Sequence, residues 1–76
     1  MAARKGLYIR RLLARNVRRY RDERGMNQTE LADAADLTQS RLSKIESAAR
    51  DIKISTVQRL ASALGVPFAA LFDETN

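Results

Sequence analysis

The chain has 76 residues, with 14 Lys or Arg against nine Asp or Glu and a net charge of +5. This length allows one small domain with a thin core and leaves no room for a second. The sequence contains neither Cys nor His, which excludes disulfides and the usual transition-metal ligands and leaves an enzyme only carboxylates and lysine to work with. We therefore expect a binding module without cofactors rather than an enzyme, and oligomerisation is the remaining route to added stability.

The basic residues are concentrated at the start of the chain. Residues 1–24 hold nine of them against Asp22 and Glu23, whereas residues 25–54 and 55–76 are each close to neutral. This distribution favours a polyanionic partner, with nucleic acid first and an anionic membrane surface second, or a basic helix that is merely solvated. No segment has the roughly 20 apolar residues of a membrane span, and acidic residues are unusual in a transit sequence. We therefore expect a cytoplasmic protein without a membrane partner.

The first predicted element is a helix over residues 7–24, because apolar residues recur there at spacings of three and four. They form one stripe, which consists of Ile9, Leu13, Val17 and Tyr20. Tyr8 and Leu12 lie beside this stripe, so we expect both tyrosines to be core residues rather than platforms on which bases stack. Gly25 ends the helix, as a residue that tolerates a positive φ past the last turn.

The next two predicted helices are short and follow each other closely. Asn27 and Glu30 form a capping box, which predicts a helix over residues 28–35. Its inward-facing side chains are Leu31, Ala34 and Ala35. After a three-residue connection, Thr38 can cap a third helix over residues 39–47. Its apolar residues are Leu42 and Ile45.

The rest of the chain predicts a loop and two more helices. Residues 48–54 have no clear period and are expected to form the loop. Ser55 and Gln58 form a second capping box, so we expect the fourth helix to open there. Its core side consists of Val57, Leu60, Ala61 and Leu64. Gly65 stops this helix, and Pro67 occupies the first position of a final short helix.

Five helices with short joints predict a compact all-α domain, because strand patterns and hairpin turns are almost absent. No internal repeat or low-complexity linker interrupts it. We expect residues 7–76 to form this single domain and residues 1–6 to form a flexible basic arm in front of it.

Residues 28–47 carry the pattern of a helix-turn-helix: two short helices, a three-residue turn and a small residue, Ala32, where the helices cross. The outer face of the second helix is free of apolar and acidic residues. It consists of Gln39, Ser40, Arg41, Ser43, Lys44 and Ser47. In the major groove of DNA, glutamine can pair with adenine, arginine or lysine with guanine, and serine with either. A merely solvated helix face is the alternative.

The match to a known family rests on five segments that include the Gly25-Met26-Asn27-Gln28 start of the motif. They are residues 17–21, 25–32, 42–46, 60–66 and 71–72. These segments resemble the Cro/cI-type helix-turn-helix, or Xre, family of bacterial and phage transcriptional regulators. The resemblance implies a five-helix lambda-repressor-like fold and sequence-specific binding to double-stranded DNA, with the recognition helix over residues 39–47 in the major groove. Among small members of the family, it leans towards the controller proteins of restriction–modification systems.

The resemblance, together with the polar face, also predicts roles for single residues. Bases are read by Gln39, Ser40, Arg41 and Lys44, although Arg41 can instead reach a phosphate. Phosphates are contacted by Asn27, Gln28, Thr38, Ser43, Ser47 and Arg50. The arginines of the first helix cover several faces, so we expect one or two of them to touch phosphate and the others to be solvated. They are Arg10, Arg11, Arg15, Arg18 and Arg19.

Two structural features also follow from the resemblance. Arg21 and Glu46 occupy the positions of an ion pair between the first helix and the end of the recognition helix. Asp36 stands where the family usually has glycine in a left-handed turn. Aspartate tolerates that conformation better than most residues, so we expect a cost of about 1 kcal/mol and no change of fold.

The C-terminal part of the chain is too apolar for a free surface on so small a domain. Some of its large side chains are expected to pack on the first helix, and the excess to form a dimer interface. The candidates are Val66, Phe68, Leu71 and Phe72. A two-fold dimer would place two recognition helices about 34 Å apart on an inverted repeat. RNA polymerase or a toxin would be further partners.

Two other functions compete with this interpretation. An antitoxin-type protein would have a toxin as its main partner and autoregulation through DNA as a secondary role. A membrane-surface helix would bind anionic vesicles through residues 4–24 alone. The favoured prediction is a homodimeric regulator, a repressor or a controller protein of bacterial or phage origin, that is associated with the nucleoid when bound to DNA.

Overall fold

The computed structural model describes the backbone of residues 2–74 and the side chains of residues 6–74. Within that range, four α-helices and one 3-10 helix follow one another: α1 (Ala2–Glu23), α2 (Gln28–Ala34), α3 (Gln39–Glu46), α4 (Ile54–Leu64) and η1 (Phe68–Phe72). No strand occurs among the described residues, so the predicted all-α fold is confirmed, with the fifth helix of 3-10 type. In the same part of the chain, no helix combines the length and hydropathy needed to cross a membrane.

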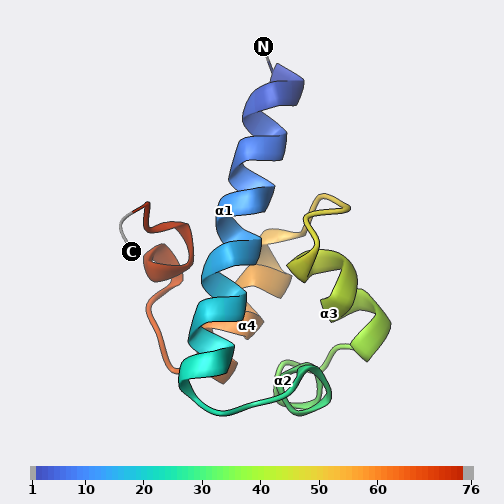
Figure 1. The fold of residues 1–76 in the computed structure, drawn as a ribbon, viewed down its shortest axis with the longest axis vertical. Helices are drawn as coiled ribbons and strands as arrows, with labels where there is room; N and C mark the ends of the chain where they lie inside the picture. The colour runs from blue at the N-terminus through green and yellow to red at the C-terminus, as the bar shows by residue number, and fades with distance from the viewer. Residues whose placement is uncertain (1, 75–76) are drawn as a thin grey trace.

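Helix α1 runs along the long axis of the molecule, and the other helices pack around its C-terminal half (Figure 1). It begins at Ala2, so residues 2–6, which we expected to form a flexible arm, have helical backbone. Tyr8 and Ile9 are 51% and 45% exposed, so the prediction that they face the core is wrong. The reason is that the first turns of α1 project beyond the other helices, and burial begins only at Leu12.

The first turns of α2 and α3 are held by the predicted caps. Asn27 Oδ1 accepts the backbone N–H of Glu30 at 2.8 Å, and Glu30 Oε1 accepts the backbone N–H of Asn27 at 2.9 Å. Thr38 Oγ1 accepts the backbone N–H of Arg41 at 3.1 Å. Each cap satisfies N–H groups that the first turn of a helix leaves without a partner, so both predicted starts are confirmed.

Helix α4 starts differently from the prediction. Its N-cap is Lys53, without a side-chain cap bond, so the capping box predicted at Ser55 is wrong. The carbonyl of Lys53 already accepts the backbone N–H groups of Thr56 at 3.0 Å and Val57 at 3.1 Å. Ser55 therefore lies inside the first turn rather than before it. At the other end, Gly65 has a φ of 70° and ends the helix as predicted.

The hydrophobic core lies where the four α-helices and η1 meet. Its buried residues are Leu13, Val17, Leu31, Ala32, Ala35, Leu42, Ile45, Val57, Leu60, Ala61, Leu64 and Leu71, and Tyr20 packs against them. Ala34 is exposed, so the prediction that it faces inward is wrong. Helix α2 packs against α3 and α4 through the face that carries Leu31 and Ala32, and Ala34 points away from both partners.

The C-terminal segment folds back against α1 (Figure 1). Asn16 Nδ2 donates to the carbonyls of Leu71 and Asp73, both at 2.9 Å. Leu71 is fully buried in the domain core, so its predicted place in a dimer interface is wrong. Pro67 is the N-cap of η1 rather than its first residue. Phe68, at 40% exposure, remains accessible on this side of the domain.

Candidate nucleic-acid interface

Helix α3 has one buried face and one exposed face. Leu42, Ile45 and Glu46 are buried. The side chains predicted to read bases are exposed, as are two serines: Gln39, Ser40, Arg41, Lys44, Ser43 and Ser47. The single carboxylate of α3 belongs to Glu46, on the buried face, so the exposed face is cationic and rich in hydrogen-bonding groups.

The connection between α2 and α3 turns the chain back sharply. Asp36 has a φ of 57°, which is the left-handed conformation predicted for it. The backbone N–H of Leu37 donates to the carbonyl of Ala32 at 2.8 Å. Ala32 is buried, as a small residue at a helix crossing should be. This turn allows Thr38 to open α3 directly after α2 and holds the two helices together.

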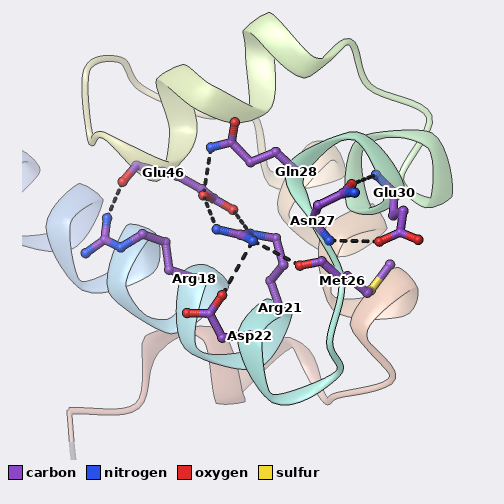
Figure 2. A network of polar contacts seen from close by, with 8 residues as sticks. All are labelled: Arg18, Arg21, Asp22, Met26, Asn27, Gln28, Glu30 and Glu46. Atoms are coloured by element: carbon purple, nitrogen blue, oxygen red, sulfur yellow. Dashed lines mark hydrogen bonds and ion pairs between the residues drawn. The ribbon is translucent and has the colours of Figure 1, made fainter.

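A bidentate ion pair joins α1 to the end of α3. Arg21 Nε and Nη2 lie 2.8 and 3.1 Å from Glu46 Oε2 and Oε1, and Figure 2 shows the two side chains facing each other. The side chains are 16% and 3% exposed. The hydrogen bond to Glu46 raises the pKa of Arg21, and burial opposes it. The pair expected from the sequence is therefore present, and Arg21 stays charged.

The same carboxylate orients Gln28, the first residue of α2. Gln28 Nε2 donates to Glu46 Oε1 at 3.0 Å. Arg21 Nη1 also donates to the carbonyl of Met26 at 3.0 Å, just before α2. The carboxylate and its partners thus connect α1, α2 and α3 at one point (Figure 2). The Gln28 amide nitrogen has two hydrogens, and its bond to Glu46 uses one of them. The second hydrogen can donate to another acceptor.

Three of the predicted phosphate contacts also serve the local structure. Asn27 and Thr38 use their side-chain oxygens as helix caps, which leaves the amide hydrogens of Asn27 and the hydroxyl hydrogen of Thr38 as donors for an external acceptor. Ser47 Oγ donates to the carbonyl of Lys44 at 3.1 Å. Ser47 would have to release that bond before donating to a phosphate.

Arg18 of α1 and Arg24, the residue directly after α1, hold the C-terminal ends of other helices. Arg18 Nη1 donates to the carbonyl of Glu46, the last residue of α3. Arg24, directly after α1, donates through Nε to the carbonyl of Leu64, the last residue of α4, at 2.5 Å. The end of a helix leaves carbonyls without partners and carries partial negative charge. A cation placed there stabilises the junction between two helices.

Two more arginines bind carbonyls outside the helices. Arg10 Nε donates to the carbonyl of Ala48 at 3.3 Å, and Arg15 Nη2 donates to the carbonyl of Asp73 at 2.9 Å. Arg10 and Arg15 are half-buried, so the expectation that the arginines without a phosphate contact are solvated is wrong for these two, whereas Arg18 is exposed as expected and also binds a carbonyl. The sequence signal for arginines that donate to backbone carbonyls is their number on one helix, in a small domain where several helix ends have carbonyls without partners.

A cleft of about 350 Å³ lies between α3 and the loop that follows it. Its lining consists of Arg41, Lys44, Ile45, Arg50, Asp51 and Ile52. Three cations and one carboxylate surround two isoleucine side chains, so the cleft has a positive excess. The fold thus places the predicted phosphate contact Arg50 next to two predicted base readers, Arg41 and Lys44.

Ala48 is strained, because its φ is 60° in a region that favours glycine. Ala48→Gly is expected to stabilise the domain by about 0.5 to 1 kcal/mol, since relief of the left-handed conformation outweighs the added freedom of the unfolded chain. Urea denaturation would measure this gain. Ala49→Gly is the matched control and should be neutral or destabilising. Equal effects of the two changes would contradict strain at Ala48.

Comparison with known proteins extends these observations. Residues 17–71 match the model of the helix-turn-helix family. Over 68 residues, the chain is 34% identical to an uncharacterized HTH-type transcriptional regulator, y4dJ, of Sinorhizobium fredii, and the match covers 90% of this chain and 88% of that protein. The family match begins at Val17 and so leaves most of α1 outside it.

Solved structures show the same arrangement of helices. A hypothetical transcription factor, NHTF, from Neisseria is similar with a TM-score of 0.83 and 34% identity, over 86% of this chain and 75% of that one. The restriction-modification controller protein C.AhdI from Aeromonas hydrophila is similar with a TM-score of 0.80 and 25% identity, over 83% of this chain and 96% of that one. The sequence match and the structural matches therefore both indicate a helix-turn-helix domain.

Proposed function

Because the chain belongs to the helix-turn-helix family of DNA-binding transcriptional regulators, we propose that it binds double-stranded DNA sequence-specifically, as a homodimer on an inverted repeat. The observation that carries this proposal is the exposed face of α3, which is cationic, has no carboxylate and is supported by the ion pair between half-buried Arg21 and buried Glu46. An α-helix fits the major groove, where each base pair presents a distinct pattern of donors and acceptors.

In this proposal, the exposed face of α3 reads base edges. Gln39 and Ser40 lie at its start, and Lys44 lies one turn after Ser40, on the same side of the helix. Glutamine suits adenine, and lysine suits guanine. Arg41 lines the cleft beside Lys44 and reaches a guanine or the neighbouring phosphate.

The segments around α3 hold the DNA backbone. Donors from the start of α2, from α3 itself and from the loop after α3 contact phosphates: Asn27, Gln28, Thr38, Ser43, Ser47 and Arg50. The Glu46 carboxylate supports this role for Gln28, because it holds the amide at the start of α2. Phosphate contacts set the register of a protein on the duplex, and base contacts set its specificity.

A second copy of the chain covers the apolar patch at the C-terminus. The rings of Phe68 and Phe72 lie with centroids 5.5 Å apart. Phe68 is exposed, and Val66 and Phe72 are half-buried. Because a single α3 contacts few base pairs, a two-fold dimer with two such helices about 34 Å apart reads a longer site.

Selection of binding sites from random duplexes tests the proposal. We expect enrichment of one inverted repeat, with an affinity that falls steeply with salt, because each phosphate contact contributes about −0.9 to the log–log slope. Recovery of no enriched sequence at low salt would overturn the proposal. Co-purification of a neighbour-encoded protein, without any enriched sequence, would favour the antitoxin function instead.

Phe68→Ala is expected to weaken the dimer by about 1 to 3 kcal/mol, because a partly exposed aromatic anchor is lost from the interface. Sedimentation equilibrium would measure the change. Ile54→Ala, at a side chain that is 73% exposed on α4, is the matched control and should leave the dimer intact. Leu71→Ala should instead unfold the domain, at a cost of about 2 to 5 kcal/mol. An unchanged dimer in Phe68→Ala would exclude this patch as the interface.

A further inference from the structure

Arg10 of α1 binds the loop between α3 and α4 at two points. Arg10 Nη1 lies 2.9 Å from Asp51 Oδ1, and Arg10 Nε donates to the carbonyl of Ala48 at 3.3 Å. In Figure 1 this loop, drawn in yellow, lies beside the middle of α1. These two contacts lie on either side of Arg50 in the sequence. Arg10 therefore fixes the loop both before and after Arg50.

The start of the loop is also held on α3, because the backbone N–H groups of Ala48 and Ala49 donate to the carbonyls of Ile45 at 3.1 Å and Lys44 at 3.0 Å, but these bonds end before Arg50. Residues 47–53 form neither helix nor strand, and both Arg50 and Asp51 are exposed. Ala48 is held in the left-handed conformation. Ile52 is the loop side chain that packs partly against the core. The position of Arg50 and Asp51 therefore depends more strongly on Arg10 than it would in a loop that is packed into the core.

We propose that Arg10 is a positioning residue of the DNA interface. It acts through Asp51 and Ala48 to keep Arg50 at the edge of the cleft, next to the two cations of α3, so that all three meet the DNA backbone together. This inference rests on the proposed function, because it gives Arg50 a phosphate to contact. It does not require Arg10 to touch DNA, since its guanidinium is engaged by the loop.

The effect of Arg10 on DNA binding can be measured separately from any effect on folding. The side chain of Asp51 is 91% exposed, and ion pairs in water contribute little to stability. Arg10→Gln and Asp51→Asn are therefore expected to fold with thermal midpoints close to that of the natural chain. A change in DNA affinity would then report the position of the loop rather than loss of the fold.

The positioning role of Arg10 can also be distinguished from a general electrostatic attraction of its charge to DNA. Arg10→Gln removes a positive charge and Asp51→Asn removes a negative one, so the double variant keeps the net charge but lacks the pair. If only charge matters, Asp51→Asn binds DNA more tightly and the double variant binds like the natural chain. If Arg10 positions the loop, the double variant binds at least about tenfold more weakly, as expected for the loss of one hydrogen bond to a charged group. Arg10→Lys, which keeps the charge but not the forked contact, should also weaken binding.

The deciding measurement is the affinity for the selected duplex as a function of salt. In the double variant, the log–log slope is expected to become shallower by about 0.9, the contribution of one phosphate. Arg50→Ala should weaken the natural chain clearly and the double variant much less, because the same contact is already lost. A double variant with the affinity and slope of the natural chain would overturn the role of Arg10.

Arg24 supplies the matched control. Like Arg10, it donates to a carbonyl and pairs with an exposed acid, here Glu23 at 3.7 Å, but it lies at the other end of α1. Glu23→Gln with Arg24→Gln also preserves the net charge and should leave the DNA affinity unchanged. An equal loss in this control would overturn the specific role of Arg10. A natural chain that selects no duplex would instead overturn the proposed function.

Discussion

Arg21→Met is expected to lower the free energy of unfolding by about 3 to 5 kcal/mol, because it leaves a buried carboxylate without its cation. Glu46 is 3% exposed, and both of its oxygens accept from Arg21. Methionine fills a similar volume but donates no hydrogen bond. The change would be read as a shift of the urea midpoint at constant slope. A loss of this size is a large part of the stability of a small domain.

The control for this prediction is Arg11→Met, at an exposed position on the same helix, which should change the stability by no more than about 0.5 kcal/mol. Adding Glu46→Gln to Arg21→Met removes the buried charge and should recover part of the loss. If Arg21→Met and Arg11→Met have equal effects, the pair does not support the fold. Since the pKa of Arg21 is raised, its contribution is fully present while Glu46 is ionised and the pH lies below the normal arginine range, and it is lost as the pH rises above that range.

Gln39→Ala or Lys44→Ala is expected to cost about 1 to 3 kcal/mol of affinity for the selected duplex and little for random DNA. The physical reason is that a base edge left without its partner is penalised only where that base is present. Both side chains are exposed, so neither change should affect folding. Fluorescence anisotropy at fixed salt, with the two duplexes in parallel, would measure the difference.

Gln58→Ala is the matched control, because Gln58 is an exposed glutamine on α4 rather than α3. It should leave both affinities unchanged. Equal losses on the selected and the random duplex would remove Gln39 and Lys44 from direct readout and would assign them to the backbone. Together with Arg21→Met, this series separates the support beneath α3 from the surface that α3 presents.

Much of the helical layout was predictable from local signals. Helix caps and stops act within one turn of backbone, so a few consecutive residues are enough to predict them. The examples are the capping box of Asn27 and Glu30, the cap at Thr38 and the stop at Gly65. The left-handed turn at Asp36 and the partners Arg21 and Glu46 were predictable only from the family resemblance, because nothing local links residues so far apart.

The errors share one physical cause. Ser55 has the chemistry of a cap, but the loop before it brings the backbone into the helix two residues earlier, at Lys53. Ile9 lies on the apolar stripe and Tyr8 lies beside it, but among the described residues no other helix covers their part of α1. Leu71 has the apolar character of an interface residue, but the fold of η1 onto α1 buries it. Each outcome depended on which element packs where, and that information is absent from a short window of residues.

The basic character of α1 shows the division most clearly. Composition alone established that the first third of the chain is basic and that the chain has no His or Cys for catalysis or metal binding. Only the tertiary structure decided what Arg10, Arg15, Arg18 and Arg24 do, because each of them donates to a backbone carbonyl brought close by folding. Arg18 and Arg24 meet helix ends, and Arg10 meets the loop after α3. A carbonyl has no signature in the sequence, since every residue carries one, and only packing determines which carbonyls lack a partner.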